Sequence, residues 1–149
     1  MADLQALERR VQVLEDIEAI KRLKARYFRY LDSQRWDDLR ELYAQDATTD
    51  YGDGQYAFEG VDAIMDFLSR SLGALRRNGR MLMHVGHMPD IEITGETTAS
   101  GYWALDDYSF DPEPEAGRRM GAYYHDEYVK TGGEWKISSG VLNEIMNSQ

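Results

Sequence analysis

The chain has 149 residues, a formal net charge of −10 at pH 7 and no cysteine. This length suits one domain, residues 1–149, with a sizeable core, and without thiols neither disulfides nor thiolate metal sites can form. The 27 acidic residues outnumber the 17 basic ones, which disfavours binding to nucleic acid or to anionic membranes. No apolar run approaches the roughly 20 residues that span a bilayer, and no signal peptide is visible at the start. We therefore expect a cytoplasmic protein of one domain.

Helical periodicity dominates the beginning of the chain. Apolar side chains recur at spacings of three and four from Leu4 to about Ser33, with charged residues between them. The stripe over residues 4–14 is narrow and suits packing on a neighbour, so residues 1–15 are a candidate N-terminal helical arm. Asp16 is placed to cap a restart of the helix after that arm.

The rest of the pattern predicts two further helices and a sheet. A short amphipathic helix begins at Trp36 and has Leu39, Leu42 and Tyr43 on its apolar side. After Arg80, period-two alternation and turn residues predict antiparallel strands. Helices followed by such a meander predict an α+β fold, a cone-shaped curved antiparallel sheet with about three helices that enclose a pocket. The expected elements beyond the short helix are a strand–turn–strand unit over Ala47–Gly60, a helix over Val61–Arg77, and strands over Arg80–Ile93, Thr97–Phe110, Arg118–Thr131 and Glu134–Met146.

Two histidines lie in the apolar run that begins the meander. His84 and His87 are three residues apart, so a regular strand points them to opposite faces, unless Gly86 hosts a bulge. This spacing is a poor chelate, and we expect no metal site. An inward His84 has two interpretations, a catalytic base in a low-dielectric wall or a packed core residue. His87 is interpreted as structural and His125 as a member of a cross-strand surface pair.

Asp32 is the carboxylate that would activate His84. It follows Tyr27 by five residues, which is about 140° around an ideal helix. The two side chains can converge on one site only if the helix ends near Asp32. The other conspicuous groups are interpreted more simply: Trp103 and Trp135 as core, and the acidic residues 106–107 and 111–115 as solvated loop charge.

Three stretches of the chain resemble a known family. They are residues 16–32 with 36–39, residues 83–91 with 99–105, and residues 121–128 with 133–137. Together they resemble the bile acid 7α-dehydratases of the SnoaL-like branch of the nuclear transport factor 2-like superfamily, beside scytalone dehydratase. The resemblance covers nearly the whole chain. It implies a pocketed α+β fold, dehydratase-type chemistry and a homo-oligomer, a trimer or a dimer.

The resemblance also implies a set of site residues. Tyr27, Asp32 and His84 match the family's catalytic tyrosine, aspartate and histidine, and Tyr51 matches a second pocket tyrosine. Near the end the chain departs from the bile acid enzymes, because Asn143 or Glu144 takes the place of their functional arginine. Scytalone dehydratase uses an asparagine there, so Asn143 is expected to bind the substrate. Without the arginine a fixed positive charge is missing, which disfavours an acidic or coenzyme A-linked substrate.

These residues can perform an elimination without a cofactor. Loss of water from a β-hydroxy ketone needs a base for the α-proton, a donor to the enolate oxygen and an acid for the departing hydroxyl. His84 can be base and acid, Asp32 can hold its tautomer, and Tyr27 with Tyr51 can bind the carbonyl. We predict a dehydratase, a lyase, for a small hydrophobic hydroxylated ring substrate of steroid or polyketide type. A ketosteroid-type isomerase or polyketide cyclase, and a non-catalytic binder of hydrophobic ligands, remain as alternatives.

Overall fold

The computed structural model describes residues 3–112 and 117–148, which form three helices and one six-stranded sheet. The predicted α+β fold is confirmed, and each strand of the predicted meander is found within a few residues of its expected bounds. The elements are α1 (Leu4–Asp32), α2 (Trp36–Arg40), β1 (Tyr43–Asp50), β2 (Ala57–Glu59), α3 (Val61–Arg77), β3 (Met81–Ile93), β4 (Thr98–Phe110), β5 (Arg118–Thr131) and β6 (Glu134–Ser148).

The sheet is mixed: it is mainly antiparallel and has one parallel pair. Its strand order is β2-β1-β6-β5-β4-β3, and β1 runs parallel to β6 while every other neighbouring pair is antiparallel. Tyr43, expected on the apolar side of the short helix, instead opens β1 opposite Ile137. The parallel pairing joins segments that are far apart in the chain, so local periodicity carries no signal for it.

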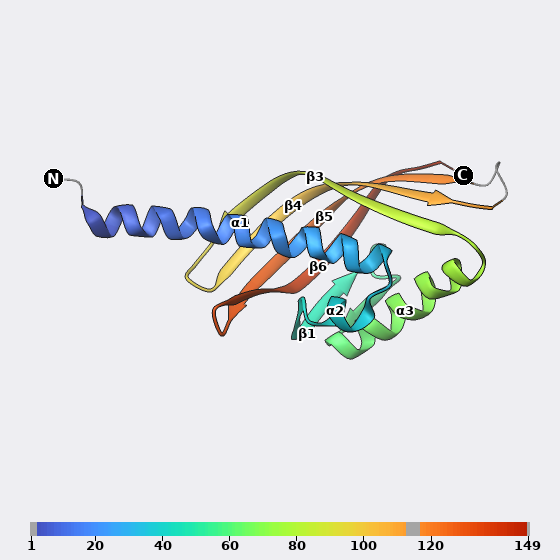
Figure 1. The fold of residues 1–149 in the computed structure, drawn as a ribbon, viewed down its shortest axis with the longest axis horizontal. Coiled ribbons are helices and arrows are strands. Elements are labelled where there is room, and N and C mark those ends of the chain that lie inside the picture. Colours follow the sequence, from blue (N-terminus) through green and yellow to red (C-terminus); the bar gives the residue numbers. More distant parts are fainter. Residues whose placement is uncertain (1–2, 113–116, 149) are drawn as a thin grey trace.

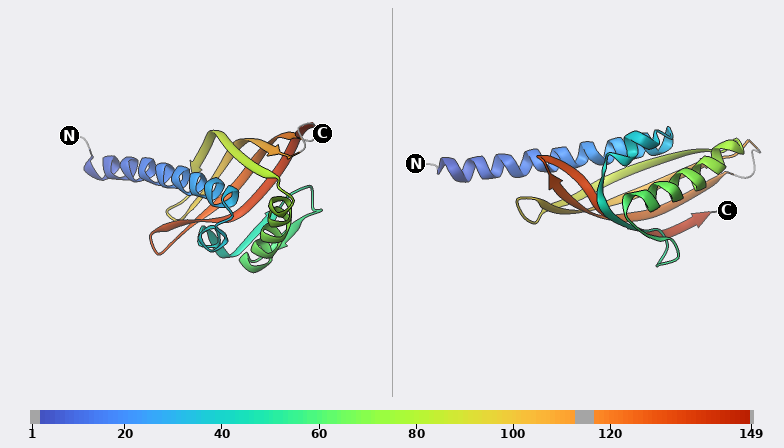
Figure 2. Two further views of the ribbon diagram at one scale, coloured as in Figure 1. Left: turned by 45° about the vertical axis from the view of Figure 1, so that its right-hand side comes forward. Right: turned by 90° about the horizontal axis from the view of Figure 1, so that it is seen from below.

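The helices cover one face of the curved sheet (Figures 1 and 2). Helix α1 lies across β3 and β6, and α3 packs beside β1 and β2. The core between the two layers is apolar and rich in aromatic side chains, and it includes Trp103 and Trp135 as expected. Within residues 3–112 and 117–148, no helix combines the length and the apolar character that a bilayer crossing needs.

Helix α1 is continuous through Asp16, so the predicted restart is wrong. Asp16 is buried and faces the sheet, where it accepts a hydrogen bond from Trp135 Nε1 at 2.9 Å and pairs with Lys130 Nζ at 2.7 Å. The helix begins instead after Asp3, whose side chain accepts from the Gln5 N–H. The turns before Asp16 extend past the sheet (Figure 1), and their apolar side chains are exposed. That exposure suits the predicted arm, and the expected homo-oligomer stays a prediction.

Candidate active site

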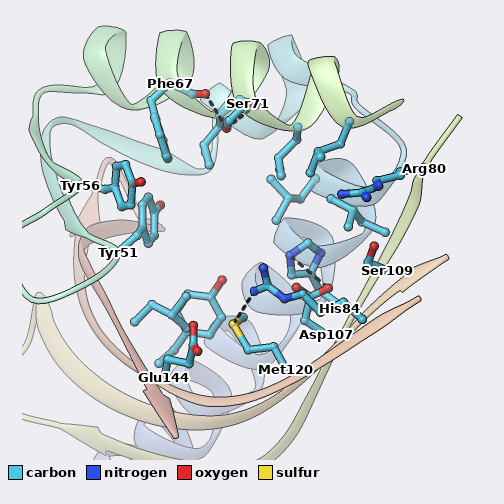
Figure 3. A pocket seen from close by; sticks show the side chains of 18 of the residues that line it. Tyr51, Tyr56, Phe67, Ser71, Arg80, His84, Asp107, Ser109, Met120 and Glu144 are labelled. Carbon is cyan, nitrogen blue, oxygen red and sulfur yellow. Dashed lines mark hydrogen bonds and ion pairs between the residues drawn. The ribbon is translucent and has the colours of Figure 1, made fainter. Parts of the chain in front are cut away.

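A cavity of about 420 Å³ lies between α3, the end of α1 and the sheet. Its two ends differ in chemistry, as Figure 3 shows: aromatic side chains gather at one end and ionisable groups at the other. The volume is within the range of roughly 300–1,000 Å³ that ligand pockets occupy. The aromatic end has Tyr51, Tyr56 and Phe67, and the ionisable end has Arg80, His84 and Asp107.

His84 and Asp32 meet at the ionisable end. Asp32 is the last residue of α1, which satisfies the condition that the helix end there. Its Oδ1 lies 2.5 Å from His84 Nδ1, and its Oδ2 accepts the His84 backbone N–H at 3.0 Å. One carboxylate therefore orients both the ring and the strand that carries it. The His84 side chain is only 9% exposed and lines the cavity, while Asp32 stands behind it.

Phe28 packs against one face of the imidazole, and Gly86 leaves room for the Phe28 ring. The Phe28 ring stacks on His84 at a centroid distance of 6.3 Å and an interplanar angle of 12°. A methyl group at Gly86 would lie 3.0 Å from Phe28 Cζ, so this ring needs a glycine beneath it. Gly86 does not host the bulge. The register of β3 shifts after His87, where Met88 has a φ of 47°.

Four tyrosines form a hydrogen-bonded cluster beside the cavity. Tyr27 contacts Tyr43 and Tyr124 edge to face, and the hydroxyls of this cluster, Tyr51 included, interact with one another. Burial raises the pKa of Tyr27 well above its usual value, and Tyr124 and the other neighbours add to the effect. Burial also raises the pKa of Tyr51. Both phenols therefore remain protonated at neutral pH and can donate to a ligand oxygen.

A buried ion pair contacts the tyrosine cluster. Lys24 is 1% exposed, its Nζ lies 2.6 Å from Asp126 Oδ2, and it sits 3.7 Å from the centroid of the Tyr124 ring. The Tyr128 hydroxyl donates to the same Asp126 oxygen and accepts from Trp103 Nε1. Burial of Lys24 is tolerated because charge, hydrogen bonds and aromatic faces satisfy its ammonium. Neither Lys24 nor Asp126 was predicted, since only the tertiary structure pairs them.

Asp107 is one of the ionisable residues of the cavity that the sequence interpretation missed. It was taken for loop charge, but it lies on β4 directly opposite His84, with its side chain 13% exposed. Asp107 Oδ1 is 4.0 Å from His84 Nε2 and, within the described part of the chain, has no hydrogen-bond partner. A signal was present, because Asp107 is in phase with the inward-facing Trp103 and Leu105.

Asn143, which the resemblance places in the substrate site, does not line the cavity. It is exposed on β6 opposite Tyr123, which is also exposed. Strand alternation brings Leu142 and Glu144 to the cavity instead. Glu144 thus supplies an acidic group near the position of the family arginine. Positive charge comes to the lining from Arg80 and Arg118.

The other two histidines lie away from the cavity. His87 is 47% exposed on the opposite face of β3, 3.5 Å from Asp106. His125 stacks on Tyr102, its cross-strand partner, at 4.3 Å. Among residues 3–112 and 117–148, no group of three or more His, Asp or Glu side chains is arranged to hold a metal. The acidic stretch predicted as loop charge reaches residues 113–116, which lie outside the described residues.

Comparison with known proteins shows which family the sequence matches. A sequence profile of the SnoaL-like domain matches residues 12–140. The uncharacterized protein Rv2910c of Mycobacterium tuberculosis is 24% identical over 127 residues, covering 85% of this chain and 84% of that one. A Novosphingobium aromaticivorans structure, provisionally described as a scytalone dehydratase, has a TM-score of 0.83 at 22% identity and covers 92% of this chain and 89% of its own.

A hexachlorocyclohexane dehydrochlorinase, LinA type 2, has a TM-score of 0.82 at 18% identity, covering 93% of this chain and 90% of its own. These structural likenesses show the fold alone, which is the nuclear transport factor 2-like, cystatin-like fold also described for a second N. aromaticivorans protein. The profile match extends over most of the chain and includes Tyr27, Asp32 and His84. The chain therefore belongs to the SnoaL-like domain family.

Proposed function

We propose that this chain is a cofactor-independent dehydratase that removes water from a hydroxylated cyclic ketone of steroid or polyketide type. The observation that carries the proposal is the contact between His84 Nδ1 and Asp32 Oδ1, with the same imidazole lining the cavity. A carboxylate at this position keeps the proton on Nδ1. The lone pair then stays on Nε2, where a base needs it.

The tyrosine cluster suits the carbonyl end of such a substrate. Tyr27 and Tyr51 line the same cavity as His84, and burial keeps both hydroxyls protonated. When His84 Nε2 takes the α-proton, the electrons of the broken C–H bond move toward the carbonyl oxygen. Phenol donors at that oxygen stabilise the enolate, and the carbon–oxygen bond to the hydroxyl can then break.

Two features support an elimination on an apolar ring. Leucines, Phe67 and Met120 provide much of the lining, so a hydrophobic ring system would be well buried. Two solved structures with this fold are described by eliminations, as a dehydrochlorinase and provisionally as a dehydratase. The argument for dehydration itself depends on the acid–base groups of this chain.

A mass-resolved screen of hydroxy-ketosteroids and hydroxylated polyketide rings tests the proposal. We expect wild type to form a product lighter by one water and His84→Ala to form none. The matched control is His87→Ala, a histidine on the same strand but the opposite face, which should retain activity. A product of unchanged mass would instead identify an isomerase or cyclase. Ligand binding without turnover would identify a binding protein, and either result overturns the dehydratase.

A further inference from the structure

Asp107 and His84 face the cavity as a pair of groups with a gap between them. The side chains come from directly opposite positions on β3 and β4 (Figure 3). The 4.0 Å between Asp107 Oδ1 and His84 Nε2 is too long for a hydrogen bond. A hydroxyl group of a ligand could contact both atoms at once. Because a buried oxygen without a partner costs free energy, the unpaired Oδ1 points to a ligand donor or a proton at this place.

The charges around Asp107 come from three elements. His84 on β3 and Arg118 on β5 attract its carboxylate, and Asp32 on α1 repels it. Burial is the strongest influence and raises the pKa of the Asp107 carboxyl above its usual value, against the attraction of His84 and Arg118. A substrate that fills the cavity removes further water, which favours the neutral carboxyl again. The neutral form has a proton to donate.

We propose that Asp107 is the acid that protonates the departing hydroxyl, so that it is needed when the site eliminates water from β-hydroxy ketones but not when it eliminates halide from their halogenated analogues. This inference rests on the proposed function. His84 Nε2 removes the α-hydrogen, and the carbon–hydrogen electrons form the new double bond. Asp107 gives its proton to the hydroxyl oxygen as the carbon–oxygen bond breaks, and water leaves. The imidazolium then returns a proton to the Asp107 carboxylate, so the enzyme gains and loses none overall.

The leaving group decides whether this acid is needed. Hydroxide is a poor leaving group and departs readily only as water, after it receives a proton. Chloride departs as a stable anion and needs no proton. A neutral Asp107 is therefore essential for the loss of water and dispensable for the loss of chloride, although both reactions need His84 as the base.

Asp107→Asn separates the two cases, because asparagine has nearly the same shape and keeps an N–H donor but has no acidic proton. The probes are 3-hydroxy-1-tetralone and 3-chloro-1-tetralone, which both give 1-naphthol after elimination, and the spontaneous rate without enzyme is subtracted. With the hydroxy ketone we expect the variant to be slower by about 10²–10⁴-fold, the usual contribution of a general acid. With the chloro ketone it should match wild type. His84→Ala should be inactive with both.

Each outcome bears on a different claim. Equal loss with both probes would make Asp107 a donor to the enolate oxygen, and unchanged rates would remove it from the reaction; either result overturns the inference. If wild type eliminates neither leaving group, the proposed function fails, and the inference with it. A pH series on wild type gives a second measurement in case the variant unfolds. Water loss, but not chloride loss, should decline as pH rises through the pKa of the acid.

Discussion

Asp32→Asn should nearly abolish turnover while the fold persists, because Asp32 serves two donors at once. One carboxylate oxygen faces His84 Nδ1 and the other accepts the His84 backbone N–H. Asparagine has only one oxygen to offer. If that oxygen accepts the backbone N–H, the amide NH2 group faces Nδ1 and donates to it. The imidazole proton then moves to Nε2, and the lone pair that the base needs is lost.

The size of the loss follows from the role of the tautomer. In an enzyme where a histidine base is oriented by aspartate, the same substitution lowers kcat by about 10⁴. At about 1.36 kcal/mol for each tenfold change, this corresponds to about 5 kcal/mol of transition-state free energy. Stability should change far less, because Asp32 is partly exposed at the end of α1 and the asparagine can keep the bond to the backbone.

Two measurements test the reasoning independently. Turnover on the substrate identified by the screen should fall on the order of 10⁴-fold, while Asp66→Asn, which changes an exposed carboxylate on α3, should leave it unchanged. Nitrogen-15 NMR of the imidazoles needs no substrate. It should report the proton of His84 on Nδ1 in wild type and on Nε2 in the variant. Turnover within tenfold of wild type, or a proton that stays on Nδ1, would refute the argument.

Three further predictions concern the surroundings of the site. Lys24→Met should lower the free energy of unfolding by about 3–5 kcal/mol, because it leaves the buried Asp126 carboxylate without its partner. Urea denaturation should show a much smaller change for Lys21→Met, on the exposed side of α1, and equal changes for the two variants would contradict the argument. Gly86→Ala should cost about 1–3 kcal/mol and weaken turnover, since the added methyl displaces Phe28 from beneath the imidazole; an unchanged melting temperature would count against it. Burial alone would raise the pKa of Asp16, but its hydrogen bonds and the charge of Lys130 outweigh burial and lower the pKa below the usual 3.8. The Asp16 carboxylate therefore stabilises the fold above pH 3.8 and loses this contribution as pH falls through the lowered pKa. Acid titration of unfolding should show wild type losing more stability than Asp16→Asn.

The helices, the strands and the candidate residues His84 and Asp32 can be predicted from the sequence, because they depend on local patterns and on the family resemblance. The stripe of α1, the alternation after Arg80 and the odd spacing of His84 and His87 depend only on helix and strand periods. These periods left open whether His84 faces inward and whether the helix ends at Asp32, and the structure settles both. The partnership of the two residues came from resemblance, and the structure shows the contact itself. Their catalytic role stays a prediction until turnover is measured.

The remaining features depend on pairing between distant segments, which no local pattern specifies. Because β1 pairs in parallel with β6, it begins at Tyr43 rather than at the predicted Ala47. The register of β6 brings Glu144 rather than Asn143 to the cavity. Asp107 looked like solvated charge because Asp106 precedes it, yet on the sheet it lies opposite His84 and is only 13% exposed. No local pattern marks Lys24 as a buried cation, because its partner Asp126 lies on β5, far along the chain. The sequence alone thus determined the elements and named His84 as a candidate base. Only the folded sheet decided which charges are buried together, because burial and Coulombic coupling depend on distance in space rather than on separation along the chain.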